Sequence, residues 1–509
     1  MKKILLPIVL ALGIQLLSAA SASGANLDYT VTVENSNSLA HVRLTISNIP
    51  SGVSSIRLSI AVPKYSSEQY VKNLMVTSEN GSVLSSIHSE NIVWVCEVAT
   101  GGENSVTVEY DAEQLIPSAL NEEEYYSYIG PAYAAIDGSY LFLTPDNLST
   151  SSIKVRVETH VAGWTVITPW QEAENEYEVD QETALFRYVL LGPFTKTERT
   201  GDGVTTVIVR HQSVAVMVSV EDEFGGLEKL TDFYRRAFGL VATDKTFWVT
   251  VPPPMYLLFK QGNTVIRSTK TLTKLSFWEG SAHEYCHMWN GGLVRFKDSA
   301  RWFKEGGTNY FADLALLGTG LGSESELKIF NAWNYYKSKL SLVDEPLAGT
   351  SSTDMIYTKG ELVTYLLNER IEEATGGQKN IYDFAGYLFQ NYSWRVLSND
   401  DILRAVNAAT GQDSSDFFSK YVYGTEKLQS AELDSGELSV PTLPGTAAAS
   451  NIRTLLMAAA AVICLIAAVC IVVWARKRLP KKFPGRPLGI EHAPKPPNTD
   501  RILDFEREV

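Results

Sequence analysis

The chain has 509 residues, which is long enough for more than one domain with its own hydrophobic core. Acidic side chains outnumber basic ones and give a formal net charge of −14, which argues against a nucleic-acid partner. Four cysteines in a chain of this length do not form the framework of a small disulfide-rich protein.

The N-terminus has the pattern of a secretory signal peptide. Met1-Lys2-Lys3 is positively charged, the residues from Ile4 to Leu17 are mostly apolar, and Ala20-Ser21-Ala22 supplies small residues for cleavage. We therefore expect residues 1–22 to be removed and the mature chain to begin near Ser23.

Residues 25–221 have the pattern of a β-rich domain. Short runs alternate β-branched and polar residues, and Gly, Pro, Asn and Ser separate them. Three of these runs are Tyr29–Val33, Ser105–Tyr110 and Thr205–Arg210. The pattern predicts an all-β, sandwich-like N-terminal domain of antiparallel strands, long enough for a core of its own.

A metal-binding pattern lies in the following segment, residues 222–427. The stretch 283–287 reads His-Glu-Tyr-Cys-His within apolar surroundings that predict a buried helix. On a helix, His283 and His287 lie on one face about 6 Å apart and can present two imidazole nitrogens to one metal ion. Imidazole suits zinc, and the neighbouring Glu284 can take a proton from water.

A second helical pattern, which continues to Leu317, supplies a third ligand. Glu305 near its start offers a carboxylate, so that two His and one Glu leave one position of a zinc tetrahedron open. Gly306 and Gly307 cost a helix about 1 kcal/mol each, so we expect this helix to approach the zinc helix closely there. Asn309, one turn after Glu305, is a candidate to hydrogen-bond the outer atom of a ligand.

These motifs together resemble those of the gluzincin metallopeptidases, in particular the aminopeptidase N and glycyl aminopeptidase families. The residues that carry the resemblance are His283-Glu284-x-x-His287, Trp302-x-x-Glu305-Gly306 and Tyr357-Thr358-Lys359-Gly360. In those families the tyrosine of the third motif stabilises the tetrahedral intermediate.

The resemblance implies a multidomain architecture in which the β-rich domain precedes an α+β, thermolysin-like (gluzincin) catalytic domain at 222–427. It implies that one Zn²⁺ per chain is held by His283, His287 and Glu305. It also implies that Glu284 and Tyr357 are the catalytic residues.

One feature departs from the aminopeptidase pattern. Aminopeptidases of these families hold the free amine of the substrate with a glutamate in a Gly-rich segment before the zinc helix. The corresponding stretch here, Phe259–Arg267, contains no acid. Gly225-Gly226-Leu227-Glu228 looks similar but precedes an earlier helix. Aminopeptidase and endopeptidase activity both stay open.

The C-terminal part has the pattern of a membrane anchor. A linker is expected at 428–452 and a transmembrane helix at 453–475, because every residue from Leu455 to Trp474 is apolar. At about 1.5 Å per residue this run crosses a hydrocarbon core of about 30 Å. Basic residues cluster after it, so the basic, Pro-rich tail at 476–509 is expected in the cytoplasm.

The sequence thus predicts a single-pass type I protein of the cell membrane whose catalytic domain is extracytoplasmic. Its predicted activity is zinc-dependent hydrolysis of peptide bonds, aminopeptidase-like in type, with peptides or proteins as substrates and the lipid bilayer as its other partner. The alternative is a catalytically inactive type I membrane binding or adhesion protein that retains a peptidase fold.

Overall fold

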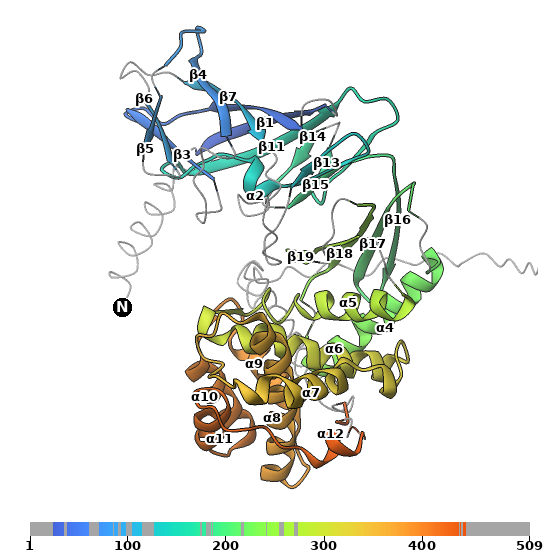
Figure 1. Cartoon of the computed structure of the whole chain (residues 1–509). Coiled ribbons are helices and arrows are strands. Elements are labelled where there is room, and N and C mark those ends of the chain that lie inside the picture. Colours follow the sequence, from blue (N-terminus) through green and yellow to red (C-terminus); the bar gives the residue numbers. More distant parts are fainter. Residues whose placement is uncertain are drawn as a thin grey trace, which may run out of the picture. The chain divides into compact units, whose positions relative to one another are not determined.

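The computed structural model describes most of the chain between residues 24 and 443 (Figure 1). The described residues are 24–34, 38–60, 71–84, 86–89, 93–97, 104–113, 127–173, 176–179, 185, 187–214, 218–240, 242–253, 259–268, 273–436, 438 and 441–443. The expected signal peptide at 1–22, transmembrane helix at 453–475 and cytoplasmic tail at 476–509 lie outside them. No helix within them is both long and apolar enough for a bilayer crossing.

The N-terminal part is built on a sheet in which seven described strands pair in the order β13-β14-β11-β1-β2-β7-β4. Buried residues alternate with partly or fully exposed ones along β1 and β7, as the period of two in the sequence predicts. Antiparallel strands were expected throughout, but β1 pairs with β11 in parallel, which makes the sheet mixed. The bounds are β1 Ala25–Val33, β2 Leu39–Ser47, β4 Val71–Ser78, β7 Ser105–Glu113, β11 Thr150–Thr159, β13 Gln171–Ala173 and β14 Glu176–Glu178.

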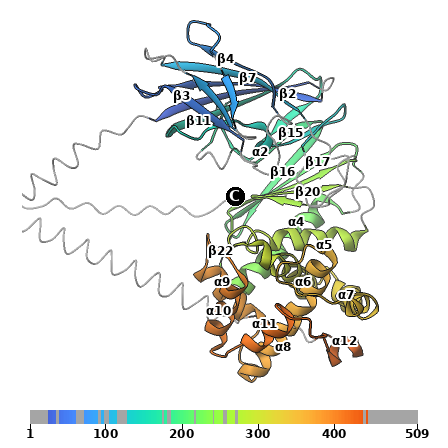
Figure 2. The ribbon, with the colours of Figure 1, turned by 60° about the vertical axis from the view of Figure 1, so that its left-hand side comes forward.

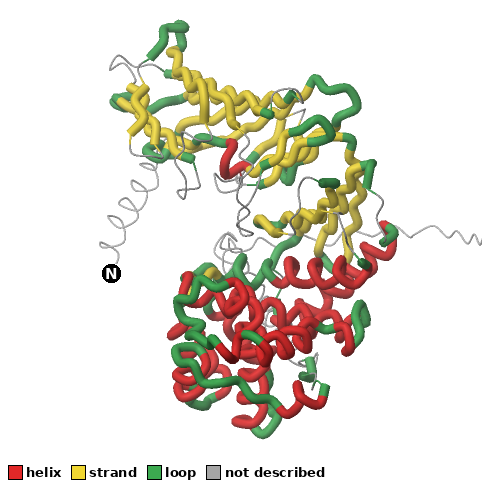
Figure 3. The backbone as a smooth tube through the Cα atoms, in the orientation of Figure 1, coloured by secondary structure: helices red, strands yellow, loops and turns green. Residues whose placement is uncertain are grey.

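Two smaller sheets complete the described β-rich part, with the strand orders β10-β3-β6-β5 and β12-β15-β9-β8. A short helix, α2, follows β9. The bounds are β3 Ser55–Ser59, β5 Ser86–Ser89, β6 Val93–Glu97, β8 Tyr128–Ile129, β9 Ala134–Asp137, α2 Gly138–Leu141, β10 Thr144–Pro145, β12 Thr165–Ile167 and β15 Tyr188–Gly192. Figure 3 shows these strands in yellow.

Buried tyrosines tie the large sheet to the segment around α2. The Tyr29 hydroxyl donates to the carbonyl oxygen of Leu143 at 2.7 Å, and the Tyr110 hydroxyl donates to that of Leu141 at 2.7 Å. A buried hydroxyl without a partner would cost folding free energy, so these two bonds let large rings fill the core. The N-terminal part therefore has its own core, as its length predicted.

A further sheet of five described strands, in the order β16-β17-β18-β20-β19, belongs to the part of the chain that carries the helices. Its three inner strands are parallel and its two outer strands antiparallel. The bounds are β16 Phe194–Gly201, β17 Val204–His211, β18 Lys245–Val251, β19 Phe259–Gln261 and β20 Thr264–Ser268. The expected boundary at residue 221 is therefore wrong, because the run Thr205–Arg210, assigned to the N-terminal domain, pairs with β18.

The rest of the described chain is mainly helical, and helices α4 and α5 lie against this sheet (Figure 2). The bounds are α4 Val220–Phe238, α5 Lys274–Cys286, η3 Asp298–Ala300, η4 Phe303–Gly307, α6 Thr308–Thr319, η5 Glu324–Glu326, α7 Lys328–Ser338, η6 Leu340–Leu342, η7 Met355–Lys359, α8 Gly360–Thr375, α9 Ile381–Asn391, α10 Asn399–Thr410, α11 Ser415–Tyr421 and α12 Ala431–Ser435. Strands β21 Arg295–Phe296 and β22 Val396–Leu397 form a small parallel pair.

A buried ion-pair cluster fixes α5 to the sheet. Arg267 on β20 pairs with Glu223 on α4, and both side chains are buried. The same guanidinium donates to the hydroxyl of Ser281 at 3.1 Å. Because Ser281 precedes the expected zinc ligands on α5 by a few residues, this contact sets the position of that helix relative to the sheet.

The linker expected from residue 428 begins later than predicted. Leu428, Leu433 and Leu438 are buried in the helical core, and α12 lies between the first and last of them. Leu443 also packs against that core. The folded part therefore reaches Leu443, because burying these leucines against the helical core removes their apolar surface from water.

Candidate metal centre and active site

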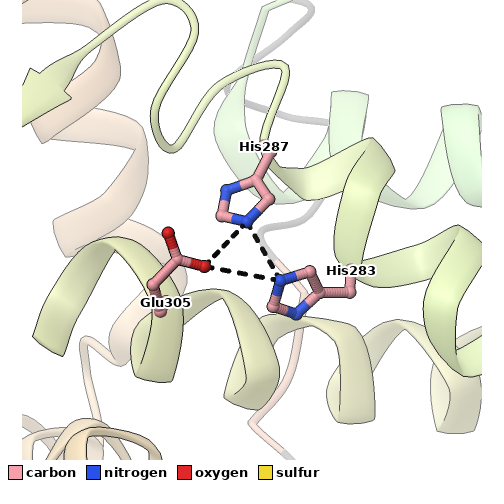
Figure 4. Close-up of side chains that lie close together, drawn as sticks. All are labelled: His283, His287 and Glu305. Atoms are coloured by element: carbon pink, nitrogen blue, oxygen red, sulfur yellow. Dashed lines mark hydrogen bonds and ion pairs between the residues drawn. The ribbon is translucent and has the colours of Figure 1, made fainter. Parts of the chain in front are cut away.

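The structure brings the three predicted zinc ligands together (Figure 4). His283 lies in the last turn of α5, and His287 is its C-cap, with its amide still bonded to the carbonyl of His283. The two Nε2 atoms are 3.0 Å apart, and Oε2 of Glu305 lies 3.2 Å from Nε2 of His287 and 3.7 Å from that of His283. All three residues are buried, with 5–8% of their surface exposed.

Both imidazoles are held with the Nε2 lone pair facing the centre. Nδ1 of His283 donates to Oδ1 of Asn309 at 2.8 Å, and Nδ1 of His287 donates to the carbonyl of Asn290 at 2.8 Å. Burial, together with the neighbouring His287, lowers the pKa of His283 to about 4. A neutral imidazole with a bonded Nδ1–H is the form that ligates a metal.

Two nitrogens and one carboxylate oxygen fit zinc. With bonds of about 2.05 Å, the ligand atoms of a zinc tetrahedron lie about 3.3 Å apart, which is close to the three separations observed. Burial acts to raise the pKa of Glu305, but in the metal-free site its two histidine neighbours and the Lys304 ammonium outweigh burial and hold that pKa well below its usual range. Glu305 is therefore a carboxylate. Its outer oxygen, Oε1, lies 2.7 Å from Nζ of Lys304.

The turn that carries Glu305 is π-helical, which the sequence did not predict. In η4 the backbone hydrogen bonds span five residues instead of four, which makes the turn wider than that of an α-helix. Such π-helical turns are frequent at functional sites. The side chain of Asn290 is fully buried, and its Nδ2 lies 2.9 Å from the carbonyl of Phe303, 3.2 Å from that of Lys304 and 3.0 Å from Oγ1 of Thr308.

Asn290 therefore acts on two ligands, since its carbonyl orients His287 and its side chain braces the turn of Glu305. Sequence reasoning missed this residue. The available signal was a polar side chain three residues after His287, inside an apolar run.

Two glycines bring Glu305 and the Tyr357 segment together. A Cβ on Gly306 would lie 2.4 Å from the amide nitrogen of Glu361, and one on Gly360 would lie 2.6 Å from the carbonyl oxygen of Trp302. Gly306 was expected to allow approach to the zinc helix, which is wrong, because the helix it approaches is α8.

Tyr357 lies beside the candidate metal ligands on a second π-helical turn, η7. Its ring stacks near His283, with the ring centroids 6.3 Å apart and the planes 23° from parallel. The neighbouring Lys359 points elsewhere: it is fully buried and pairs with Asp344, and Nζ also donates to the carbonyl of Glu345 at 2.8 Å. Lys359 thus anchors the turn while Tyr357 borders the site.

Glu284, the predicted base, follows His283 on α5 and is buried, 6% exposed. The Gly-rich segment that resembles an amine-binding motif lies elsewhere. It forms part of α4, where a Cβ on Gly226 would meet the ring of Trp278 at 2.0 Å. Glu228 lies 3.7 Å from Arg199 and is about half exposed, so that it is engaged in a surface ion pair.

Comparison with known families and structures agrees with this fold. The family described as Peptidase M61 N-terminal domain matches residues 28–188. An aminopeptidase N family protein from Idiomarina loihiensis has 17% sequence identity and a TM-score of 0.69, over 80% of this chain and 78% of that one. An M1 zinc metallopeptidase from Deinococcus radiodurans has 15% identity and a TM-score of 0.55, over 83% of this chain and 96% of that one.

A variant of the Deinococcus protein with the bound substrate Tyr-Ser-Ala matches with 14% identity and a TM-score of 0.54, over 83% of this chain and 96% of that one. No curated protein sequence matches the chain significantly. The resemblance to the gluzincin metallopeptidases is confirmed, and the chain has a β-rich N-terminal part followed by a helical part, as the M1 peptidases do.

Proposed function

We propose that this chain is a zinc-dependent metallopeptidase, anchored in a membrane and acting on peptides or proteins outside the cytoplasm. The observation that carries the proposal is the convergence of three buried ligand atoms, Nε2 of His283, Nε2 of His287 and Oε2 of Glu305. The likeness of the fold to M1 zinc metallopeptidases supports it. One Zn²⁺ per chain is the expected content.

The mechanism assigns a role to each residue around the metal. Zinc, when bound, acts as a Lewis acid that polarises the peptide carbonyl and acidifies water. Glu284 takes a proton from the attacking water and later gives it to the leaving amine. Tyr357 donates its hydroxyl hydrogen to the oxyanion that develops on the carbonyl, a role suited to its place beside His283.

Membrane anchoring is part of the proposal and is supported by the sequence. The apolar run Leu455–Trp474 with basic residues after it gives a type I span at 453–475, with the tail at 476–509 in the cytoplasm. The signal-peptide pattern of residues 1–22 agrees with an extracytoplasmic catalytic domain.

We propose aminopeptidase-like cleavage as the first expectation, because the aminopeptidase N family protein shares the fold. The alternative is an inactive binding or adhesion protein, favoured by the lack of an acid in Phe259–Arg267. Retention of the three ligands together with Glu284 and Tyr357 favours the enzyme, since a binding module has no use for the full set.

The test compares the wild-type protein with Glu284→Gln and with the control Glu373→Gln, which changes a side chain that is 80% exposed on α8. Bound zinc is measured by elemental analysis, and cleavage of a mixed peptide library is read by mass spectrometry. We expect one zinc in all three proteins and cleavage only in the wild type and the control. The cut positions separate aminopeptidase from endopeptidase. Zinc without cleavage by the wild type would favour the binding protein.

A further inference from the structure

Two buried carboxyl groups lie behind the metal centre and take no part in the mechanism above. Asp313 on α6 and Glu361 on α8 are 1% and 2% exposed, and a side-chain hydrogen bond joins them. Two carboxylates in contact and away from water repel each other strongly, so such a pair retains one proton. The question is which of the two carries it.

The surroundings of Asp313 favour its charged form. Its Oδ2 accepts from the backbone amide of Ile329 at 2.9 Å, and the amide of Lys328 also bonds to the side chain. These amides open helix α7, whose N-terminus favours a negative charge. The Lys328 ammonium stabilises the charge, and the Glu279 carboxylate opposes it.

Glu361 has no comparable set of donors. Its Oε1 and the Oδ1 of Asp313 are both buried, and neither receives a hydrogen from another N–H or O–H group in the described part of the chain. A proton on Glu361 satisfies both oxygens at once, because the carboxylic acid then donates to Asp313. We propose that Glu361 is a neutral carboxylic acid that donates its O–H to Asp313 and positions the metal ligand His283 through Asn309.

The link to His283 runs through one amide side chain. Oδ1 of Asn309 already accepts from Nδ1 of His283 at 2.8 Å, so its NH₂ group is the one that bonds to Glu361. If this amide were turned over, its NH₂ would face Nδ1 of His283. The ring would then need the other tautomer, with its hydrogen on Nε2, the atom that must bind the metal. Glu361 thus selects the metal-binding tautomer, and the inference rests on the proposed role of His283 as a ligand.

The direction of the pKa shifts agrees with this assignment. Burial, and then the charge of Asp313, raises the pKa of Glu361 well above its usual range, with Lys328 acting in the opposite sense. Burial also raises the pKa of Asp313, but the amides of Ile329 and Lys328 and the charge of Lys328 oppose the rise.

The experiment uses the full chain and four substitutions, of which Asp313→Asn tests whether the proton lies on Asp313 instead. Glu361→Gln imitates the neutral acid, because its NH₂ can donate to Asp313 and its oxygen can accept from Asn309. Glu361→Leu removes both bonds. Glu373→Gln makes the same change as the first variant on the exposed face of the same helix. Infrared spectra at neutral pH report a protonated carboxylic acid, and absorption titration with Co²⁺ reports metal affinity.

We expect a carboxylic-acid band in the wild type and in Glu373→Gln that is absent in Glu361→Gln. Co²⁺ affinity should change less than about threefold in Glu361→Gln and fall about 10- to 100-fold in Glu361→Leu. A band that persists in Glu361→Gln and disappears in Asp313→Asn would place the proton on Asp313 and overturn the assignment. Unchanged Co²⁺ affinity in Glu361→Leu would overturn the positioning role.

The two proposals fail in different ways. If the wild type binds no Co²⁺, the proposed metallopeptidase is refuted and the positioning role falls with it, while the infrared band still tests the protonation of Glu361. If the wild type binds Co²⁺ and shows no carboxylic-acid band, only the inference about Glu361 is refuted. Should Glu361→Leu not fold, the loss of the band in Glu361→Gln decides the assignment.

Discussion

Replacing Asn290 with Ala should weaken both folding and metal binding, because one side chain serves both. The substitution removes the amide donor to the carbonyls of Phe303 and Lys304. Lys304 keeps a bond from the hydroxyl of Thr308 at 2.6 Å, whereas the carbonyl of Phe303 loses its side-chain donor. A buried acceptor left without that partner costs about 1–3 kcal/mol. The small cavity adds about 1 kcal/mol, so we expect a loss of about 2–4 kcal/mol in the free energy of unfolding.

The effect on the metal follows from the place of Glu305 on the same turn. If η4 relaxes toward an ordinary α-helix, the residues of the turn rotate about the helix axis, and the carboxylate moves away from the two imidazoles. Loss of an outer partner of this kind typically lowers metal affinity 10- to 100-fold. Urea unfolding of the metal-free protein and competitive zinc titration measure the two quantities separately.

Asn391→Ala provides the matched control. Its side chain also donates to a backbone carbonyl, that of Tyr387 at 2.8 Å, but it lies on the exposed surface of α9. We expect the control to stay within about 0.5 kcal/mol of the wild type. If Asn290→Ala also stays within that range and binds zinc as tightly as the wild type, then Asn290 does not brace the turn.

Three further predictions concern the same region. Tyr357→Phe should lower kcat about 10²- to 10³-fold and leave the zinc content unchanged. Steady-state kinetics measures kcat and elemental analysis measures zinc, and a fall in zinc content would contradict the prediction. Gly306→Ala should lower the free energy of unfolding, measured with urea, by about 1–3 kcal/mol, because the added Cβ would meet backbone atoms. The control Gly225→Ala places its Cβ where no atom lies within 4 Å and should stabilise α4 by up to about 1 kcal/mol. Equal effects of the two substitutions would exclude the close contact at Gly306. Because the pKa of Glu361 is raised in the folded state, its stabilising effect is complete below pH of about 4.3 and is lost as the pH rises toward the folded pKa. Between that pH and the folded pKa, the free energy of unfolding of the wild type should fall by about 1.4 kcal/mol per pH unit relative to that of Glu361→Gln. A difference between the two proteins that stays constant at every pH, measured by urea unfolding, would refute this.

Local patterns were sufficient to find the three candidate metal ligands. The spacing of His283 and His287 places both on one helix face whatever surrounds the helix, and Glu305 was found from its place in the next helical pattern. Tyr357 was found through resemblance, since a lone tyrosine carries no signal of its own. The structure brings these side chains together, and their roles in zinc binding and catalysis stay predictions.

The sequence alone indicated which parts of the chain form strands and which form helices, because periodicity and turn residues act over a few positions. It predicted strands in the first part of the chain and helices after them, and the structure has both in that order. It did not determine which strands pair. The run Thr205–Arg210 has the same alternation in either sheet, so only the tertiary structure showed that it pairs with β18.

Tertiary structure also decided how the centre is supported. The π-helical turns, the bond network of Asn290 and the pair of Asp313 and Glu361 all depend on contacts between different segments of the folded chain. A buried polar residue looks the same in the sequence whether its partner is water, backbone or another side chain. The physical reason is that a hydrogen bond is specified by position in space, while a sequence pattern specifies position only along one helix or strand.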